Sequence, residues 1–360
     1  MIDGVVVVTG VGSYWGSRVA SRLVAETDLH VIGLDAQPPR LEIQGLDYIQ
    51  ADVRNPLLSK LLAAENVDTV CHLAFLDTLR PSETAFDLNV SGTAHLLGAC
   101  VEAKVRKVIL RSSIAVYGAR PINSAFLTEE APLRGSQRMG YIRDMVEIES
   151  FCRGFRREAQ DLILTILRFA HIIGPTAETP MNSYLRQPWV SSLLGFDPMM
   201  QLIHESDVAA ALVHAVYFDA PGLFNVGAED PMPLNKVRGL AEKPPIAVFH
   251  PLLYWSMGLL GRRAFRGSQY PPIDPDYLRY PCVGDLTRMR QDMDFRPHYA
   301  AEDALRELAE HKRLADQMPE STILAQSAER LGDIMEQRER AREHRLKSGS
   351  RAGEGEEDGR

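Results

Sequence analysis

The chain opens on Gly4-Val-Val-Val-Val-Thr-Gly-Val-Gly-Ser-Tyr-Trp-Gly16, and this stretch decides the fold. Four consecutive valines after Gly4 predict a strand that is buried on both faces. Val19, Leu23 and Val24 then recur at the spacing of one helix face. The glycine-rich segment 9–16 therefore joins a buried strand to a helix.

This junction has the features of a dinucleotide site. Glycines there let the backbone N–H groups at the start of the helix approach a pyrophosphate. Asp35 ends the second predicted strand, 19 residues after Gly16. An acidic side chain at that point accepts hydrogen bonds from both ribose hydroxyls of NAD and repels the 2′-phosphate of NADP. The pattern predicts NAD as cofactor.

Short β-branched runs continue to alternate with helical patterns through the first half of the chain. Strands are predicted at 30–34, 47–50, 69–73, 107–112 and 162–169, and helices at 18–25, 57–65 and 84–103. Strands separated by helical connections of this length form parallel sheets with right-handed crossovers. The expected fold class is α/β, a Rossmann-type doubly wound parallel sheet.

The alternation breaks over 174–198 and 228–281 and resumes between them, with a helix at 206–217 and a strand at 223–226. We expect an NAD-binding Rossmann domain at 1–175, to which 204–227 returns. A smaller, interleaved substrate-binding lobe is expected from 176–203 and 228–312. Residues 321–360 hold nine acidic and eight basic side chains and predict a charged, disordered tail.

Composition narrows the possible partners. A formal net charge of -8 argues against a nucleic-acid partner, which needs a concentrated basic surface. The four cysteines lack metal-binding spacing, which predicts a reduced, cytoplasmic protein without a metal. The start of the chain shows no export signal, and the apolar run 251–261 is too short to cross a bilayer, so no stable membrane insertion is expected.

Several motifs, in this order, resemble the extended short-chain dehydrogenase/reductase family, which includes NAD-dependent epimerases, dehydratases and 3β-hydroxysteroid dehydrogenase-like enzymes. They are Ala51-Asp52-Val53, His72-Leu-Ala-Phe75, Asn89-Val-Ser-Gly-Thr93, Arg111-Ser-Ser-Ile-Ala-Val-Tyr-Gly118, Leu167-Arg-Phe-Ala-His-Ile-Ile-Gly-Pro175 and His204-Glu-Ser-Asp-Val-Ala209. The resemblance covers residues 4–310.

The resemblance implies a set of cofactor-contacting residues. They are Gly10, Gly12, Ser13, Tyr14, Trp15, Gly16, Asp35, Asp52, Val53, Leu73, Ala74, Phe75, Asn89, Ser112, Tyr141, Phe169 and His171. One departure lies among them, because Ser13 stands where the family turn has its middle glycine. A homodimer formed by the helices at 84–103 and 139–157 is also implied.

The family performs its chemistry with a serine, a tyrosine and a lysine placed four residues after the tyrosine. The resemblance assigns the serine to Ser113 and the tyrosine to Tyr141, but the lysine position holds Met145. Residues four apart share a helix face, so Met145 stands where the ammonium would act on the tyrosine. With a pKa of about 10, an unassisted tyrosine is ionised in only about one molecule in 10³ at pH 7.

Few other cations are available to assist Tyr141. The chain has only seven lysines, and none lies between Lys107 and Lys236. Arg111, Arg138 and Arg168 are the candidates for a substitute.

Two functions therefore stay open. The first is an NAD-dependent oxidoreductase or epimerase of reduced or altered activity, acting on a hydroxyl or carbonyl of a nucleotide sugar or a sterol-like alcohol. The second is a catalytically silent NAD-binding sensor or scaffold. Aromatic residues at 249, 254, 255 and 270 favour a hydrophobic ligand.

Overall fold

The computed structural model describes residues 4–39, 42–78, 80–187, 189–248 and 273–317. The chain divides into a unit of Met1–Ala309 and a unit of Glu310–Arg360, and the fold below is that of the first unit. The predicted tail at 321–360 and the aromatic residues at 249–270 lie outside the described residues. The division into a Rossmann domain and a substrate lobe stays a prediction.

A seven-stranded parallel sheet forms the centre of the first unit, in the order β11-β6-β5-β4-β1-β2-β3. The strands are β1 (Val5–Thr9), β2 (His30–Asp35), β3 (Asp47–Gln50), β4 (Val67–His72), β5 (Lys107–Ser113), β6 (Ile163–Phe169) and β11 (Gly222–Val226). The strand order reverses between β1 and β4, and ligands bind at the carboxyl ends of the strands beside such a reversal. The doubly wound fold is confirmed.

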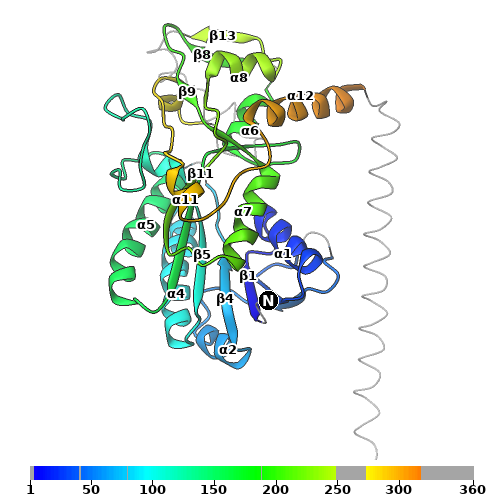
Figure 1. The fold of residues 1–360 in the computed structure, drawn as a ribbon, viewed down its shortest axis with the longest axis vertical. Coiled ribbons are helices and arrows are strands. Elements are labelled where there is room, and N and C mark those ends of the chain that lie inside the picture. Colours follow the sequence, from blue (N-terminus) through cyan, green and yellow to red (C-terminus); the bar gives the residue numbers. More distant parts are fainter. Residues whose placement is uncertain (1–3, 40–41, 79, 188, 249–272, 318–360) are drawn as a thin grey trace, which may run out of the picture. The chain divides into compact units, whose positions relative to one another are not determined.

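Helices cover both faces of this sheet (Figure 1). Val6 and Val8 of β1 pack with α1 (Tyr14–Glu26) and α7 (Glu205–Tyr217), whereas Val7 packs on the other face with α2 (Leu58–Ala64) and α4 (Gly92–Glu102). The second half of α5 (Gly140–Glu158) joins the core of this other face. Burial on both faces explains why β1 is uniformly apolar rather than alternating.

The helix predicted at 84–103 is interrupted. It consists of α3 (Glu83–Phe86), a π-helical turn η1 (Asp87–Ser91) and α4. Asn89 lies in this turn, and its side-chain amide exchanges hydrogen bonds with the backbone of Leu76 at 2.8 and 3.0 Å. The amide also donates to Asp144 of α5 at 3.0 Å. A side chain bound on two sides in this way favours a local widening of the helix, which the apolar periodicity did not reveal.

Smaller elements complete the described part of the first unit. They are β7 (His171–Ile173) with β10 (Leu202–His204), β9 (Met199–Met200) with β12 (Met232–Pro233), β8 (Val190–Leu193) with β13 (Pro245–Val248), and the helices α6 (Pro180–Leu185), α8 (Leu234–Leu240), η3 (Pro275–Leu278) and α11 (Thr287–Gln291). The helix α12 (Ala301–Gln317) crosses the boundary of the two units.

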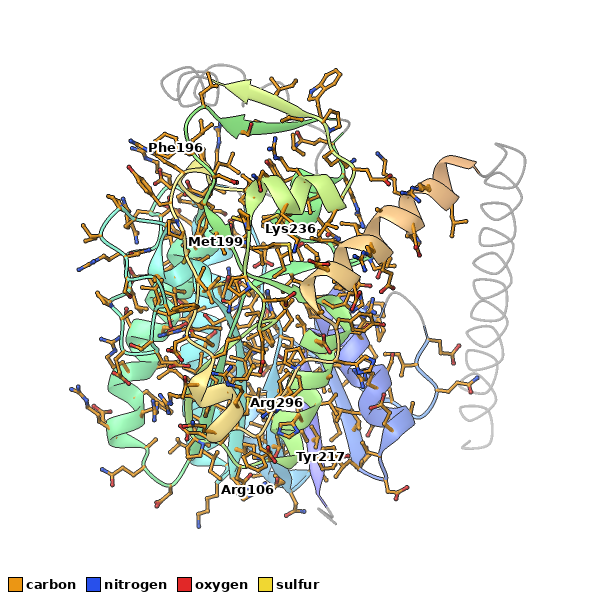
Figure 2. All side chains as sticks on the ribbon, turned by 45° about the horizontal axis from the view of Figure 1, so that its top comes forward. Arg106, Phe196, Met199, Tyr217, Lys236 and Arg296 are labelled. Carbon is orange, nitrogen blue, oxygen red and sulfur yellow. The ribbon has the colours of Figure 1, made fainter. Side chains whose placement is uncertain are left out.

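Figure 2 shows Met199 and Lys236 toward one end of the first unit, and Arg106 and Tyr217 at the opposite end. No helix among the described residues is long and apolar enough to span a membrane. All four cysteines are buried free thiols.

A buried ion pair connects the sheet to α5. Arg168 of β6 and Glu149 of α5 are at most 1% exposed, and Arg168 Nε donates to Glu149 Oε2 at 2.9 Å. Arg168 Nη1 also donates to the Tyr117 hydroxyl at 2.7 Å and to the Glu129 carbonyl at 2.9 Å. Ser112 donates to the same Glu149 carboxylate at 2.5 Å. These contacts compensate two desolvated charges and fix the position of α5.

Removing one member of this pair is expected to destabilise the protein strongly. Arg168→Met leaves Glu149 buried without its cation, so we expect a loss of about 3–5 kcal/mol in the free energy of unfolding. Arg22→Met is the control, because Arg22 pairs with Glu26 on the surface, where such pairs contribute about 0–1 kcal/mol. Urea denaturation measures both, and equal losses would contradict the assignment.

Candidate active site

The glycine turn after β1 is packed against the loop that follows β4. Gly10 has φ +78°, and a Cβ there would lie 2.6 Å from backbone atoms of Leu73 and Ala74. Thr9 holds the same loop, because its hydroxyl accepts from the backbone N–H groups of Leu73 at 3.1 Å and Ala74 at 3.3 Å. Only glycine fits at position 10.

Asp35 closes the other side of the turn. Its carboxylate accepts from the backbone N–H groups of Gly12 and Gln37, both at 2.9 Å. The carboxylate therefore lies beside the glycine turn at the end of β2, where a ribose would contact it.

Ser13 has a structural role at the position of the missing glycine. It is the N-cap of α1, and its hydroxyl accepts from the Gly16 N–H at 3.2 Å. A Cβ on Gly16 would lie 2.0 Å from the Gly10 carbonyl oxygen, so this glycine closes the turn on itself. The serine thus stabilises the start of α1.

The structure brings together eight of the predicted cofactor residues in one groove. These are Gly10, Gly12, Ser13, Asp35, Asp52, Val53, Ala74 and Phe75. Trp15, Ser112, Tyr141 and His171 line a second pocket. Tyr14, Gly16, Leu73, Asn89 and Phe169 line neither, and their contact with a cofactor stays a prediction.

Tyr14 is directed elsewhere. Its hydroxyl donates to Glu205 at 3.0 Å and accepts from Arg18 at 2.6 Å. Burial raises the pKa of Tyr14, and the nearby Glu205 carboxylate raises it further. Thr176, on the loop after β7, lies 2.9 Å from the same hydroxyl. Tyr14 therefore links α1 to that loop, and no sequence pattern indicated this contact.

The second pocket lies at the carboxyl end of β5 and the start of α5. It contains Ser113, Tyr141 and Met145 together. The structure thus brings the three predicted positions, one from β5 and two from α5, into the same pocket. Ser113 is also the N-cap of a short 3-10 turn and accepts from the Ala115 N–H at 3.2 Å. Met145 is 6% exposed and occupies the helix face next to Tyr141.

The surroundings of Tyr141 oppose its ionisation. Burial raises the pKa of its hydroxyl, and the carboxylates of Asp274 and Asp77 raise it further. The tyrosine of this pocket is held in its neutral form.

The three arginines considered as substitutes for lysine differ in their placement. Arg168 is committed to Glu149 in the core, and Arg138 is exposed and lines neither cavity. Arg111 lines the pocket, is 8% exposed, and lies 3.3 Å from a carboxylate oxygen of Asp77. Lys107 donates to the carbonyls of Ala215 and Val216 at the amino end of β5, next to the labelled Arg106 in Figure 2.

Several pocket residues were not anticipated. Asp77 follows the motif at 72–75, and Glu178 precedes the Thr179-Pro180 start of α6, whose capping pattern was available in the sequence. Tyr277 comes from a distant segment; its hydroxyl donates to the Ala115 carbonyl at 3.1 Å, and its ring lies 5.2 Å from that of His171. Only the tertiary fold brings Tyr277 to the pocket.

Comparison with known proteins identifies the family. Residues 6–227 match the family described as NAD dependent epimerase/dehydratase. The chain belongs to this family. The resemblance to extended short-chain dehydrogenases/reductases is thereby confirmed, and NAD, the cofactor of the family, is confirmed at the family level.

The curated relatives and solved structures agree with this assignment. An uncharacterized protein of Mycobacterium tuberculosis is 33% identical over 309 residues, covering 83% of this chain and 82% of that protein. UDP-glucose 4-epimerase of Thermotoga maritima, solved with UDP-glucose, has a TM-score of 0.66 at 19% identity and covers 87% of this chain and 100% of its own. dTDP-glucose 4,6-dehydratase of Bacillus anthracis, solved with NAD, has a TM-score of 0.65 at 16% identity, with 86% and 96% covered. These two structures show the same fold.

The groove fits the cofactor of the family. Gly10, Gly12 and Ser13 of the glycine turn line the groove directly before α1, where a pyrophosphate would bind. The Asp35 carboxylate is placed for the ribose, and Asp52 and Val53 line the far part of the same groove.

Asp35 is expected to decide between NAD and NADP. We expect the protein to bind NADH more tightly than NADPH, and Asp35→Asn to weaken NADH binding by about tenfold or more, since it removes hydrogen bonds to a charged group. The ratio of the NADH affinity to the NADPH affinity should fall, because the asparagine would no longer repel the 2′-phosphate of NADPH. Fluorescence titration measures both affinities. Asp47→Asn, an exposed carboxylate on β3, is the control, and a natural preference for NADPH would overturn the role of Asp35.

Proposed function

We propose that this protein is an NAD-dependent enzyme of the epimerase/dehydratase type that acts on a hydroxyl or carbonyl of a nucleotide sugar, with lower turnover than an enzyme that has the lysine. The observation that carries the proposal is the meeting of Ser113 and Tyr141 in one pocket beside Trp15 of the glycine turn. The likeness to enzymes solved with UDP-glucose supports the substrate class.

The residues of the pocket have distinct tasks in this proposal. NAD, when bound, accepts or returns a hydride. Ser113 donates a hydrogen bond to the reacting oxygen of the substrate and orients it, while Tyr141 exchanges a proton with that oxygen. Met145 provides neither charge nor a donor, so the helix face next to Tyr141 contributes only packing.

The raised pKa of Tyr141 defines the pH dependence. As a base, Tyr141 must lose its proton before it can accept one from the substrate. A raised pKa makes the ionised form rarer at neutral pH, so oxidation of a hydroxyl should accelerate as the pH rises toward that pKa.

A second candidate function is a catalytically silent NAD-binding sensor or scaffold. The observation that favours it is that Asp274 and Asp77 both oppose ionisation of Tyr141. Absence of hydride exchange in an NAD-loaded protein would support this candidate.

The proposal also includes a homodimer and a cytoplasmic location. A homodimer through α4 and α5 is supported by Val101 and Phe151, which are 46% and 40% exposed on these helices. A cytoplasmic location is supported by the four free thiols.

Restoring the lysine is expected to raise activity. Met145→Lys places an ammonium on the helix face of Tyr141, which should lower the pKa of its hydroxyl and shift the rising limb of the pH–rate profile to lower pH. At pH 7 we expect a rise in kcat of about tenfold for each unit by which the limb shifts. Tyr141→Phe should reduce hydride exchange to background. The readout is the rate of UDP-glucose conversion from pH 6 to 10, because a reaction of this type returns the hydride to the sugar and leaves no net NADH.

Met199→Lys serves as the control for an added lysine, because Met199 is 39% exposed and lines neither cavity. It should leave the pH–rate profile unchanged. Turnover that survives Tyr141→Phe would exclude Tyr141 as the proton carrier. A Met145→Lys profile that coincides with that of the natural protein would exclude the missing lysine as the cause of low turnover.

A further inference from the structure

The catalytic pocket contains a buried positive charge that the proposed proton transfer does not use. Arg111 and Ser113 lie two positions apart on β5, so their side chains share one face of the strand. Both line the pocket with Tyr141. Arg111 is 8% exposed, so its guanidinium is largely removed from water.

This guanidinium is only partly compensated within the described part of the chain. Its Nη2 lies 3.3 and 3.4 Å from the two carboxylate oxygens of Asp77, longer than the roughly 2.7–2.9 Å of a strong charge-assisted hydrogen bond. Asp77 is itself 37% exposed, which weakens the pair further. Nε of Arg111 is buried and has no hydrogen-bond partner among the described residues. A buried donor on a charged group without an acceptor is costly.

The other charged groups of the pocket do not replace this acceptor. Glu178 lines the same pocket but is engaged in an interaction of its own. The ring of Phe75 lies 5.6 Å from the guanidinium carbon and covers one of its faces. Arg111 thus lines the pocket with a donor that no described residue satisfies.

We propose that Arg111 is a specificity-determining residue that binds a carboxylate on the sugar of the substrate, which makes a nucleotide-linked sugar acid the preferred substrate class. The planar guanidinium matches a carboxylate through two parallel hydrogen bonds, and an anionic oxygen compensates the buried charge where a neutral hydroxyl does not. This inference rests on the proposed nucleotide-sugar function and names the substrate class within it.

The test compares two ligands that differ only at C6 of the sugar. UDP-glucuronic acid carries a carboxylate there, and UDP-glucose carries a hydroxymethyl group. We expect the full-length, NAD-loaded protein to bind UDP-glucuronic acid at least about tenfold more tightly, the effect of one hydrogen bond between charged groups. Isothermal titration calorimetry measures both affinities without requiring turnover.

Two variants should change this ratio in opposite directions. Arg111→Gln keeps much of the side-chain length but removes the charge, so the ratio should fall to about one through weaker binding of the acid alone. Asp77→Asn removes the competing carboxylate and should raise the ratio. Arg290→Gln is the matched control, because Arg290 lies 3.6 Å from Glu229 in a partly exposed pair outside the pocket.

The outcomes separate this inference from the proposed function. A ratio near one in the natural protein, or a ratio that Arg111→Gln leaves unchanged, would overturn the role of Arg111. Failure of both ligands to bind would overturn the proposed nucleotide-sugar function and, with it, this inference. Should Arg111→Gln not fold, an Asp77→Asn ratio equal to that of the natural protein would overturn it equally. A preference for the acid without hydride exchange would contradict only the proposed enzymatic function.

Discussion

The contact between two backbones at the carboxyl ends of β1 and β4 is the constraint on which the site depends. Gly10 lies so close to Leu73 and Ala74 that a single Cβ would overlap them. The Thr9 hydroxyl accepts a hydrogen bond from the Leu73 N–H of the same loop, and its Oγ1 lies 2.7 Å from His72 Nδ1. Burial lowers the pKa of His72 to about 3, so a neutral ring links the two strands. This contact positions the glycine turn and, a few residues along the loop, Asp77.

The same contact relates the cofactor groove to the catalytic pocket. The loop after β4 lines the groove with Ala74 and Phe75 and the pocket with Asp77. Trp15, in the first turn of α1 directly after the glycine turn, lines the pocket as well. A displacement of this loop would therefore alter cofactor binding and the electrostatics of Tyr141 together.

Sequence reasoning succeeded where the signal is local. The strand at 47–50 has the bounds observed for β3, and the four-residue spacing of Tyr141 and Met145 places both on one helix face in the pocket. It failed where a side chain is bound by distant groups. The hydroxyl of Tyr14 is taken by Glu205, and the pairing of Arg111 with Asp77 depends on the adjacency of β4 and β5. The periodicity of apolar residues along the chain does not reveal partners that lie far apart in the sequence.

The effect of a positive charge in this pocket depends on the element that carries it, and here Arg111 of β5 carries it. A lysine on the face of α5 would lower the pKa of Tyr141, whereas Asp77, the partner of Arg111, raises it. Arg111 instead helps to keep His72 neutral. The Asp77 carboxylate of this pair thus acts on Tyr141, and the Arg111 guanidinium lines the pocket. In the proposed function, a charge in this arrangement acts on what the pocket binds rather than on Tyr141.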